Sequence, residues 1–80
     1  MKTDIYLDKE RSDQERELEE AFKYQKLGQL QKAELTYKKI LKINPDHGKA
    51  LHFLGLIAHQ KGNYHMAADL INKAVRIYPQ

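Results

Sequence analysis

The chain has 80 residues, which allows one domain with a small core. With only four glycines, two prolines and no cysteine, it is neither collagen-like nor of low complexity, and it has no disulfides, thiol nucleophiles or cysteine-ligated zinc. The formal net charge of +3 is uneven, because residues 1–20 carry four Lys and Arg against eight Asp and Glu, whereas the remainder carries ten against three.

The first eleven residues show no sustained hydrophobic periodicity, and we expect residues 1–11 to be a flexible lead-in. They lack the apolar core of a signal peptide, and no run in the chain approaches the roughly 20 apolar residues of a membrane-spanning helix. The absence of cysteine is compatible with the reducing cytoplasm, where we expect the protein to reside. The lead-in has one apolar cluster, consisting of Ile5, Tyr6 and Leu7.

The segment after the lead-in predicts a first helix. Ser12 with Glu15 three residues later matches a capping box, so we expect this helix to start at Ser12. Gly28 is expected to end it, because glycine accepts the left-handed conformation that is common just past a helix end. The apolar stripe of this helix comprises Leu18, Ala21 and Phe22.

Three further helices are predicted over residues 30–43, about 46–61 and 64–77. Pro45 separates the second from the third, because the residue before a proline disfavours the helical conformation. Gly62 and Asn63 form the next turn. The third helix is apolar on so many sides that we expect it to be covered on more than one face.

The sequence repeats itself at a fixed interval. Gly62 falls on Gly28, Ala67 on Ala33, and Pro79 on Pro45 when the second half of the chain is aligned with the first. A fixed period of about 34 residues is the signature of a helical repeat protein, in which each unit packs against its neighbours.

The second copy resembles the tetratricopeptide repeat, whose pattern is W-x2-L-G-x2-Y…A-x3-F…P. Leu51 stands at the Trp position, Leu54 and Gly55 follow at the expected spacing, Ala67 and Ile71 replace the Ala and Phe, and Pro79 ends the unit. The resemblance implies an all-α fold of two stacked antiparallel helix-turn-helix hairpins, a fragment of a right-handed α-solenoid. Repeat one is expected over residues 12–45 and repeat two over residues 46–80.

The residue pattern gives no indication of an enzyme, a metal site or a cofactor. His52 and His59 are seven residues apart on one helix face, about 10 Å, which is too far for two ligands of one ion. Ser12, the only serine, is assigned to the helix cap, and no glycine-rich phosphate loop is present. We therefore expect a binding module and not a catalyst.

The resemblance implies a concave groove, lined by the first helix of each repeat, that receives a peptide or a partner protein. Some relatives clamp a C-terminal carboxylate with groove asparagines, but Glu19 and Phe53 occupy those positions here. The residues expected to line the groove are Leu18, Phe22, Gln25, Lys26, Lys49, His52, Phe53, Leu56, His59 and Gln60.

Two other functions remain open. Residues 54–60 look similar to repeats of bacterial proteins that join such arrays to glycosyltransferase-type domains, so the chain could be the recognition fragment of a larger enzyme.

Nucleic-acid binding through a basic face is less favoured, because no aromatic residues are interleaved with its basic residues for base stacking. The basic face would consist of Lys32, Lys38, Lys39, Lys42 and Arg76.

The two ends of the sequence differ in polarity. Glu17 and Glu20 replace residues that a preceding repeat would cover, which indicates a true beginning, whereas the last helix lacks a polar cap. We expect an artificial or oligomer-covered end, with a homodimer in which the last helix packs on its own copy or on the Ile5–Leu7 cluster of a partner. The surface expected to self-associate comprises Met66, Leu70, Ile71, Val75, Ile77 and Tyr78.

Overall fold

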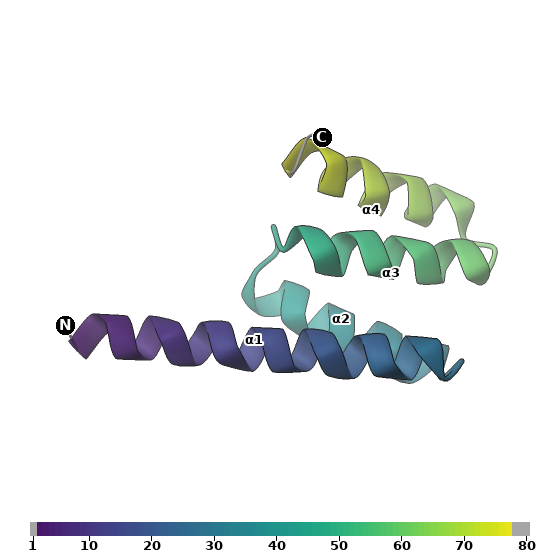
Figure 1. The fold of residues 1–80 in the computed structure, drawn as a ribbon. Helices are drawn as coiled ribbons and strands as arrows, with labels where there is room; N and C mark the ends of the chain where they lie inside the picture. Colours follow the sequence, from purple (N-terminus) through teal and green to yellow (C-terminus); the bar gives the residue numbers. More distant parts are fainter. Residues whose placement is uncertain (1, 78–80) are drawn as a thin grey trace.

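The structure is a computed structural model that describes the backbone of residues 2–77 and the side chains of residues 13–77. It contains the helices α1 (Lys2–Lys26), α2 (Leu30–Ile43), α3 (Gly48–Gln60) and α4 (Tyr64–Ile77). Each helix runs antiparallel to the next, and the helices pack as two pairs, α1 with α2 and α3 with α4 (Figure 1). The all-α fold with two helix-turn-helix pairs is the one predicted from the sequence.

The two hairpin turns occupy equivalent positions in the two repeats and have the same geometry. Gly28 and Gly62 have φ angles of 78° and 85°, a left-handed conformation that costs glycine little. In the first turn the Gln29 N–H donates to the Tyr24 carbonyl at 2.9 Å, and in the second the Asn63 N–H donates to the Ala58 carbonyl at 2.8 Å. The predicted positions of both turns are confirmed, and so are the bounds of α2 and α4.

The start of the first helix was predicted wrongly. Helix α1 begins at Lys2 and not at Ser12, so residues 2–11 are helical where a flexible lead-in was expected. The capping-box spacing misleads here, because Ser12 caps a helix only if the preceding chain leaves the helical conformation. No glycine or proline interrupts residues 2–26, and most of them have straight-chain side chains that favour helix. The first turns of α1 therefore extend beyond the other three helices (Figure 1).

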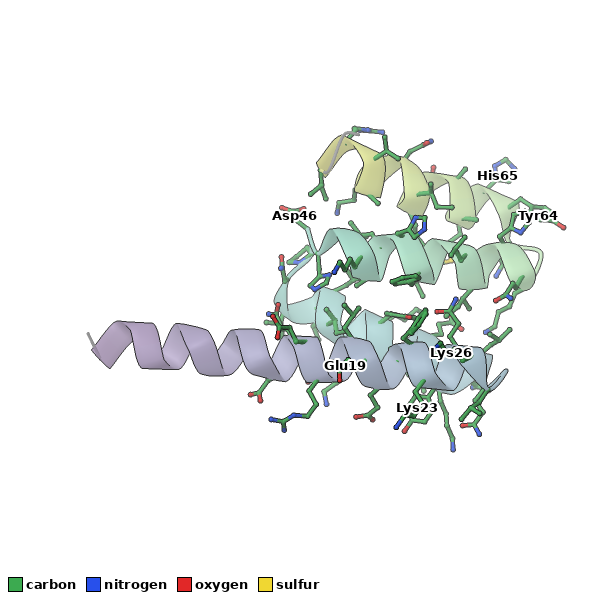
Figure 2. All side chains as sticks on the ribbon, in the orientation of Figure 1. Glu19, Lys23, Lys26, Asp46, Tyr64 and His65 are labelled. Atoms are coloured by element: carbon green, nitrogen blue, oxygen red, sulfur yellow. The ribbon has the colours of Figure 1, made fainter. Side chains whose placement is uncertain are left out.

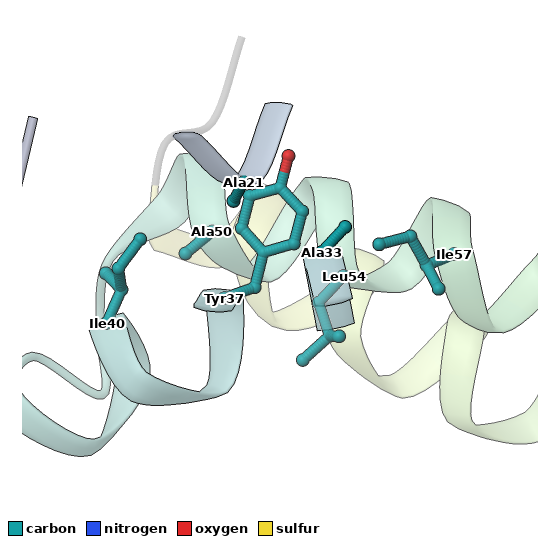
Figure 3. Close-up of a cluster of buried hydrophobic side chains, with 7 residues drawn as sticks. All are labelled: Ala21, Ala33, Tyr37, Ile40, Ala50, Leu54 and Ile57. Atoms are coloured by element: carbon teal, nitrogen blue, oxygen red, sulfur yellow. The ribbon is translucent and has the colours of Figure 1, made fainter. Parts of the chain in front are cut away.

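A single buried cluster joins the two hairpins through α2 and α3 (Figure 3). Its largest side chain, Tyr37 of α2, is fully buried, and burial raises the pKa of its phenol to about 12. The hydroxyl donates a hydrogen bond to the Gln25 Oε1 atom of α1 at 2.8 Å, so its polar atom is satisfied. The alanines allow close helix approach. The cluster comprises Ala21, Ala33, Tyr37, Ile40, Ala50, Leu54 and Ile57.

Helix α3 packs against both α2 and α4, as predicted from its many apolar residues. More than half of its residues are buried. On the α2 side, the Lys61 ammonium bonds to the Glu34 carboxylate, and the pKa of Glu34 is lowered chiefly by this hydrogen bond, with Lys38 contributing. On the α4 side, Gly55 meets Ile71 at very close range. The lack of a side chain at Gly55 therefore sets the separation of α3 and α4.

We predict that Gly55→Ala destabilises the domain. An added Cβ would lie 2.7 Å from Ile71 Cγ1 and 3.3 Å from the Ala67 carbonyl oxygen. Overpacking of this kind costs about 1–3 kcal/mol, which exceeds the roughly 1 kcal/mol that alanine gains over glycine in a helix. Urea unfolding followed by circular dichroism should show a net loss of about 1 kcal/mol.

A double-mutant cycle tests the cause of that loss. Ile71→Ala removes the clashing atoms, so Gly55→Ala should cost less in the Ile71→Ala background than in the wild type. An increase in stability on Gly55→Ala alone would show that the helices separate without penalty at this point.

A charged residue is partly buried between α1 and α2. Glu17 pairs with Lys39 at 3.8 Å, but its Oε2 atom is buried with no hydrogen-bond partner among the described residues. Its counterpart in the second repeat is Leu51, which is buried. A carboxylate therefore occupies a position where the second repeat places an apolar side chain.

We predict that Glu17→Leu stabilises the domain by about 1 kcal/mol, because replacing an incompletely satisfied buried charge with an apolar side chain is often neutral or stabilising. Losing the ion pair with Lys39 costs little free energy, because the Lys39 side chain is already exposed to water. Thermal unfolding should show a higher midpoint. The matched control is Glu19→Leu at an exposed position of the same helix, with an expected change below about 0.5 kcal/mol. A lower midpoint for Glu17→Leu would mean that its ion pair outweighs the buried unpaired oxygen.

Candidate functional site: a groove between α1 and α3

An open groove of about 770 Å³ lies between α1 and α3, which run in the same direction (Figure 1). The C-terminal part of α4 completes it. Its lining residues are Gln14, Glu15, Leu18, Glu19 and Phe22 of α1, His47, Gly48, Lys49, His52 and Phe53 at the start of α3, and Ala74 and Val75 of α4.

Two phenylalanines form the apolar floor at one end of the groove. The rings of Phe22 and Phe53 lie 5.3 Å apart between centroids, and Phe53 stacks on the buried Tyr37 at 5.9 Å. Phe22 keeps 38% of its surface exposed. The core thus holds Phe53 in place, and Phe53 supports a partly exposed aromatic surface that a ligand could cover.

The two walls of the groove carry opposite charge. On α1, Glu15 and Glu19 are exposed, and neither forms an ion pair with another described residue. Figure 2 shows Glu19 on α1. On α3, Lys49 is exposed and likewise unpaired within the described part of the chain. The positive end of the α3 dipole adds to the charge of Lys49, because the first N–H groups of a helix have no partner inside it.

His47 caps the helix that forms the basic wall. Its Nδ1 atom accepts a hydrogen bond from the Ala50 N–H at 3.2 Å, which requires the unprotonated nitrogen. Partial burial lowers the pKa of His47, and the charge of Lys49 lowers it further. The neutral ring is therefore favoured, and the N-terminus of α3 stays ordered beside the groove.

Half of the groove residues predicted from the sequence line this cavity. They are Leu18, Phe22, Lys49, His52 and Phe53. The other five lie nearer the C-terminal ends of α1 and α3 and do not line it. They are Gln25, Lys26, Leu56, His59 and Gln60.

Three of the residues outside the cavity have intramolecular contacts instead. Gln25 accepts the hydrogen bond of Tyr37, and the Lys26 ammonium lies 4.9 Å from the centroid of the Phe22 ring. The ring of His59 meets that of Tyr64 at 5.1 Å, edge to face. These contacts give the three side chains roles within the domain.

The residues at the open end of the groove were not predicted from the sequence. Gln14 precedes Leu18 by four residues, and Glu15 precedes Glu19 by four, so continuing the helical spacing one turn back would have found both. This spacing was overlooked because a helix start at Ser12 was expected. Gln14 and Glu15 were then assigned to the helix cap and not to the face that lines the groove. No sequence signal pointed to Val75, since only the packing of α4 brings it to the groove.

Of the six residues expected to self-associate, the five that the structure describes do not form one exposed surface. Met66 and Val75 are exposed, but nine positions at about 100° each place them on opposite sides of α4. Leu70, Ile71 and Ile77 are half-buried. Tyr78 and the Ile5–Leu7 side chains lie outside the described residues.

The internal repeat identifies a different apolar stripe on α4. On α2, α3 covers a stripe that includes Tyr37. The equivalent positions on α4, one repeat later, have no helix against them within the described chain other than α3, the hairpin partner of α4, on which Ile71 packs at Gly55. Tyr64 and Val75 in this second stripe are 63% and 55% exposed. The α4 stripe comprises Tyr64, Ala68, Ile71 and Val75.

Other types of site find little support in the described part of the chain. No three His, Asp or Glu side chains there lie close enough together to hold a metal ion. No described helix is long and apolar enough to cross a bilayer. In the basic set expected for nucleic acid, Lys38 and Lys39 already form ion pairs with Glu34 and Glu17.

Comparison with known proteins assigns both hairpins to the same repeat. Two tetratricopeptide-repeat family models match the chain, one over residues 21–47 and the other over residues 48–80. The chain is also 36% identical to tetratricopeptide repeat protein 7B of Homo sapiens over 50 residues, which is 62% of this chain and 6% of the human protein. The internal period, the paired helices and these adjoining matches lead to one conclusion: residues 21–80 belong to the tetratricopeptide-repeat family.

Proposed function

We propose that the chain is a non-catalytic binding module whose α1–α3 groove holds a segment of a partner protein. The observation that supports this most directly is the partly exposed Phe22 ring, which rests on Phe53 at the end of an open groove. Tetratricopeptide repeats are generally protein-interaction modules, which agrees with such a role. Covering an aromatic side chain of this kind contributes on the order of 1.5–3 kcal/mol.

We predict that Phe22→Ala weakens partner binding without unfolding the domain. A displayed peptide library selected on the immobilised domain supplies ligands, and amide chemical shifts locate their binding site. Affinity for groove-binding peptides should fall at least tenfold, because an aromatic anchor is lost. Circular dichroism checks that the variant remains folded.

Leu35→Ala is the matched control, because Leu35 is a 61% exposed apolar residue of α2 outside the groove. It should change the affinity less than twofold. The proposal fails if the folded Phe22→Ala variant binds as the wild type does, or if the selected peptides shift only amides of α2 and of the part of α4 outside the groove. Selection of no peptide, together with binding of oligonucleotides that weakens steeply with salt, would favour a nucleic-acid partner.

We also propose a second binding role, self-association through the α4 stripe. The support is its equivalence to the α2 stripe, which α3 covers inside the domain. A two-fold dimer in which two α4 helices pack against each other would cover Tyr64 and Val75 of both copies. Each large apolar side chain covered would contribute on the order of 1.5–3 kcal/mol.

We predict that Val75→Glu weakens this dimer at least tenfold, because it places a charge in the stripe. Met66→Glu is the matched control, since Met66 is 45% exposed on the opposite side of α4. Sedimentation equilibrium over a range of concentrations measures both. A wild-type chain that stays monomeric at high micromolar concentration, or equal weakening by the two variants, would contradict self-association through this stripe.

A further inference from the structure

The groove offers three surfaces of different character to whatever it binds. One wall, on α1, carries the Glu15 and Glu19 carboxylates. The floor is apolar and includes Phe22 and Phe53. The other wall carries the Lys49 ammonium beside the N-terminus of α3. A ligand that meets all three surfaces must present basic, apolar and acidic groups in three directions.

A helix meets this requirement better than an extended chain does. Side chains of a strand point alternately to two opposite faces, so a strand can address both walls or the floor, but not all three. Side chains of a helix are distributed around its whole circumference. An apolar stripe can therefore face the floor while charged residues on either side of the stripe face the walls.

We propose that the groove binds an amphipathic helix of a partner protein, with a basic edge against α1 and an acidic edge against α3. The proposal rests on the proposed function of the groove and specifies its ligand. The lining residues of α1 extend from Gln14 to Phe22, roughly 12 Å at 1.5 Å per residue, so the groove contacts about two turns of the bound helix. Charge complementarity selects this ligand from other apolar helices.

The charged walls also fix the direction in which the bound helix lies. Turning a helix end for end, with its apolar stripe still on the floor, exchanges its two edges. The basic edge would then face Lys49 and the acidic edge would face Glu15 and Glu19. Opposite walls therefore favour one direction of binding for a helix with one basic and one acidic edge.

Three synthetic helical peptides test the proposal. All carry the same apolar stripe and blocked termini; one has a basic and an acidic edge, the second has two basic edges, and the third has two acidic edges. We expect the mixed-edge peptide to bind about tenfold more tightly than either of the others, because each of them brings a like charge to one wall. A nitroxide at its N-terminus should broaden amide signals more strongly at one end of the groove than at the other.

Charge reversal of the α1 wall provides the matched variant. In the double variant Glu15→Lys and Glu19→Lys, the peptide with two acidic edges should become the tightest ligand. The control variant, Glu20→Lys with Asp69→Lys, changes the net charge by the same amount at exposed positions outside the groove, and should keep the wild-type order.

The proposal is overturned if the three peptides bind equally well to the wild type, if wall reversal leaves their order unchanged, or if the nitroxide broadens both ends alike. It is also overturned if library-selected peptides occupy the groove as extended chains. In each of these cases the groove still binds protein segments, so the proposed function stands. If no peptide shifts the groove amides at all, the proposed function fails as well.

Discussion

The burial of Tyr37 between the two hairpins is the interaction on which the rest of the structure depends. Its ring belongs to α2, stacks on Phe53 of α3, and sends its hydroxyl to Gln25 of α1. One side chain thus links three helices, and its polar atom is satisfied inside the core. Burial raises the pKa of the phenol to about 12, so the ring remains neutral and the link persists throughout the physiological pH range.

The groove is a consequence of this link. One side of the Phe53 ring packs on the buried Tyr37, which restricts its rotation. Phe53 in turn contacts Phe22, which faces the groove. The charged side chains on the two walls lie outside the core and take part in none of these contacts. Stability and recognition are therefore separated, and the wall residues Glu15, Glu19 and Lys49 can be exchanged without removing a buried side chain.

The two repeats have the same arrangement of helices but differ in which apolar surface remains exposed. Small residues set the helix spacing in both, with Ala21 in the first hairpin at the position that Gly55 holds in the second. Helix α2 has α3, a helix of the other hairpin, against its apolar stripe. Within the described chain the equivalent stripe of α4 contacts its own hairpin partner α3 and leaves Tyr64 and Val75 largely exposed. The same stacking that builds the domain therefore leaves a second surface suited to binding a helix.

The helical architecture could be read from the sequence because its determinants are local. The spacing of apolar residues, the left-handed glycines Gly28 and Gly62, and Pro45 together predicted the turns and the bounds of α2 and α4. The internal period then predicted the pairing, because residues at equivalent positions must pack in equivalent ways. The largest local error, a helix start at Ser12, arose because a capping-box spacing also occurs within helices. The start of α3 was predicted about two residues too early.

Which side chains form the groove was decided only by tertiary packing. Leu18, Phe22 and Phe53 were predicted, since helix periodicity places them on the inner side of their own helices. The sequence alone could not show that Val75 of α4 reaches the same cavity. Nor could it show that Gln25 accepts a hydrogen bond from Tyr37, because the two residues belong to different helices. Periodicity determines the face of a helix on which a residue lies, but only the packing of helices determines which faces meet.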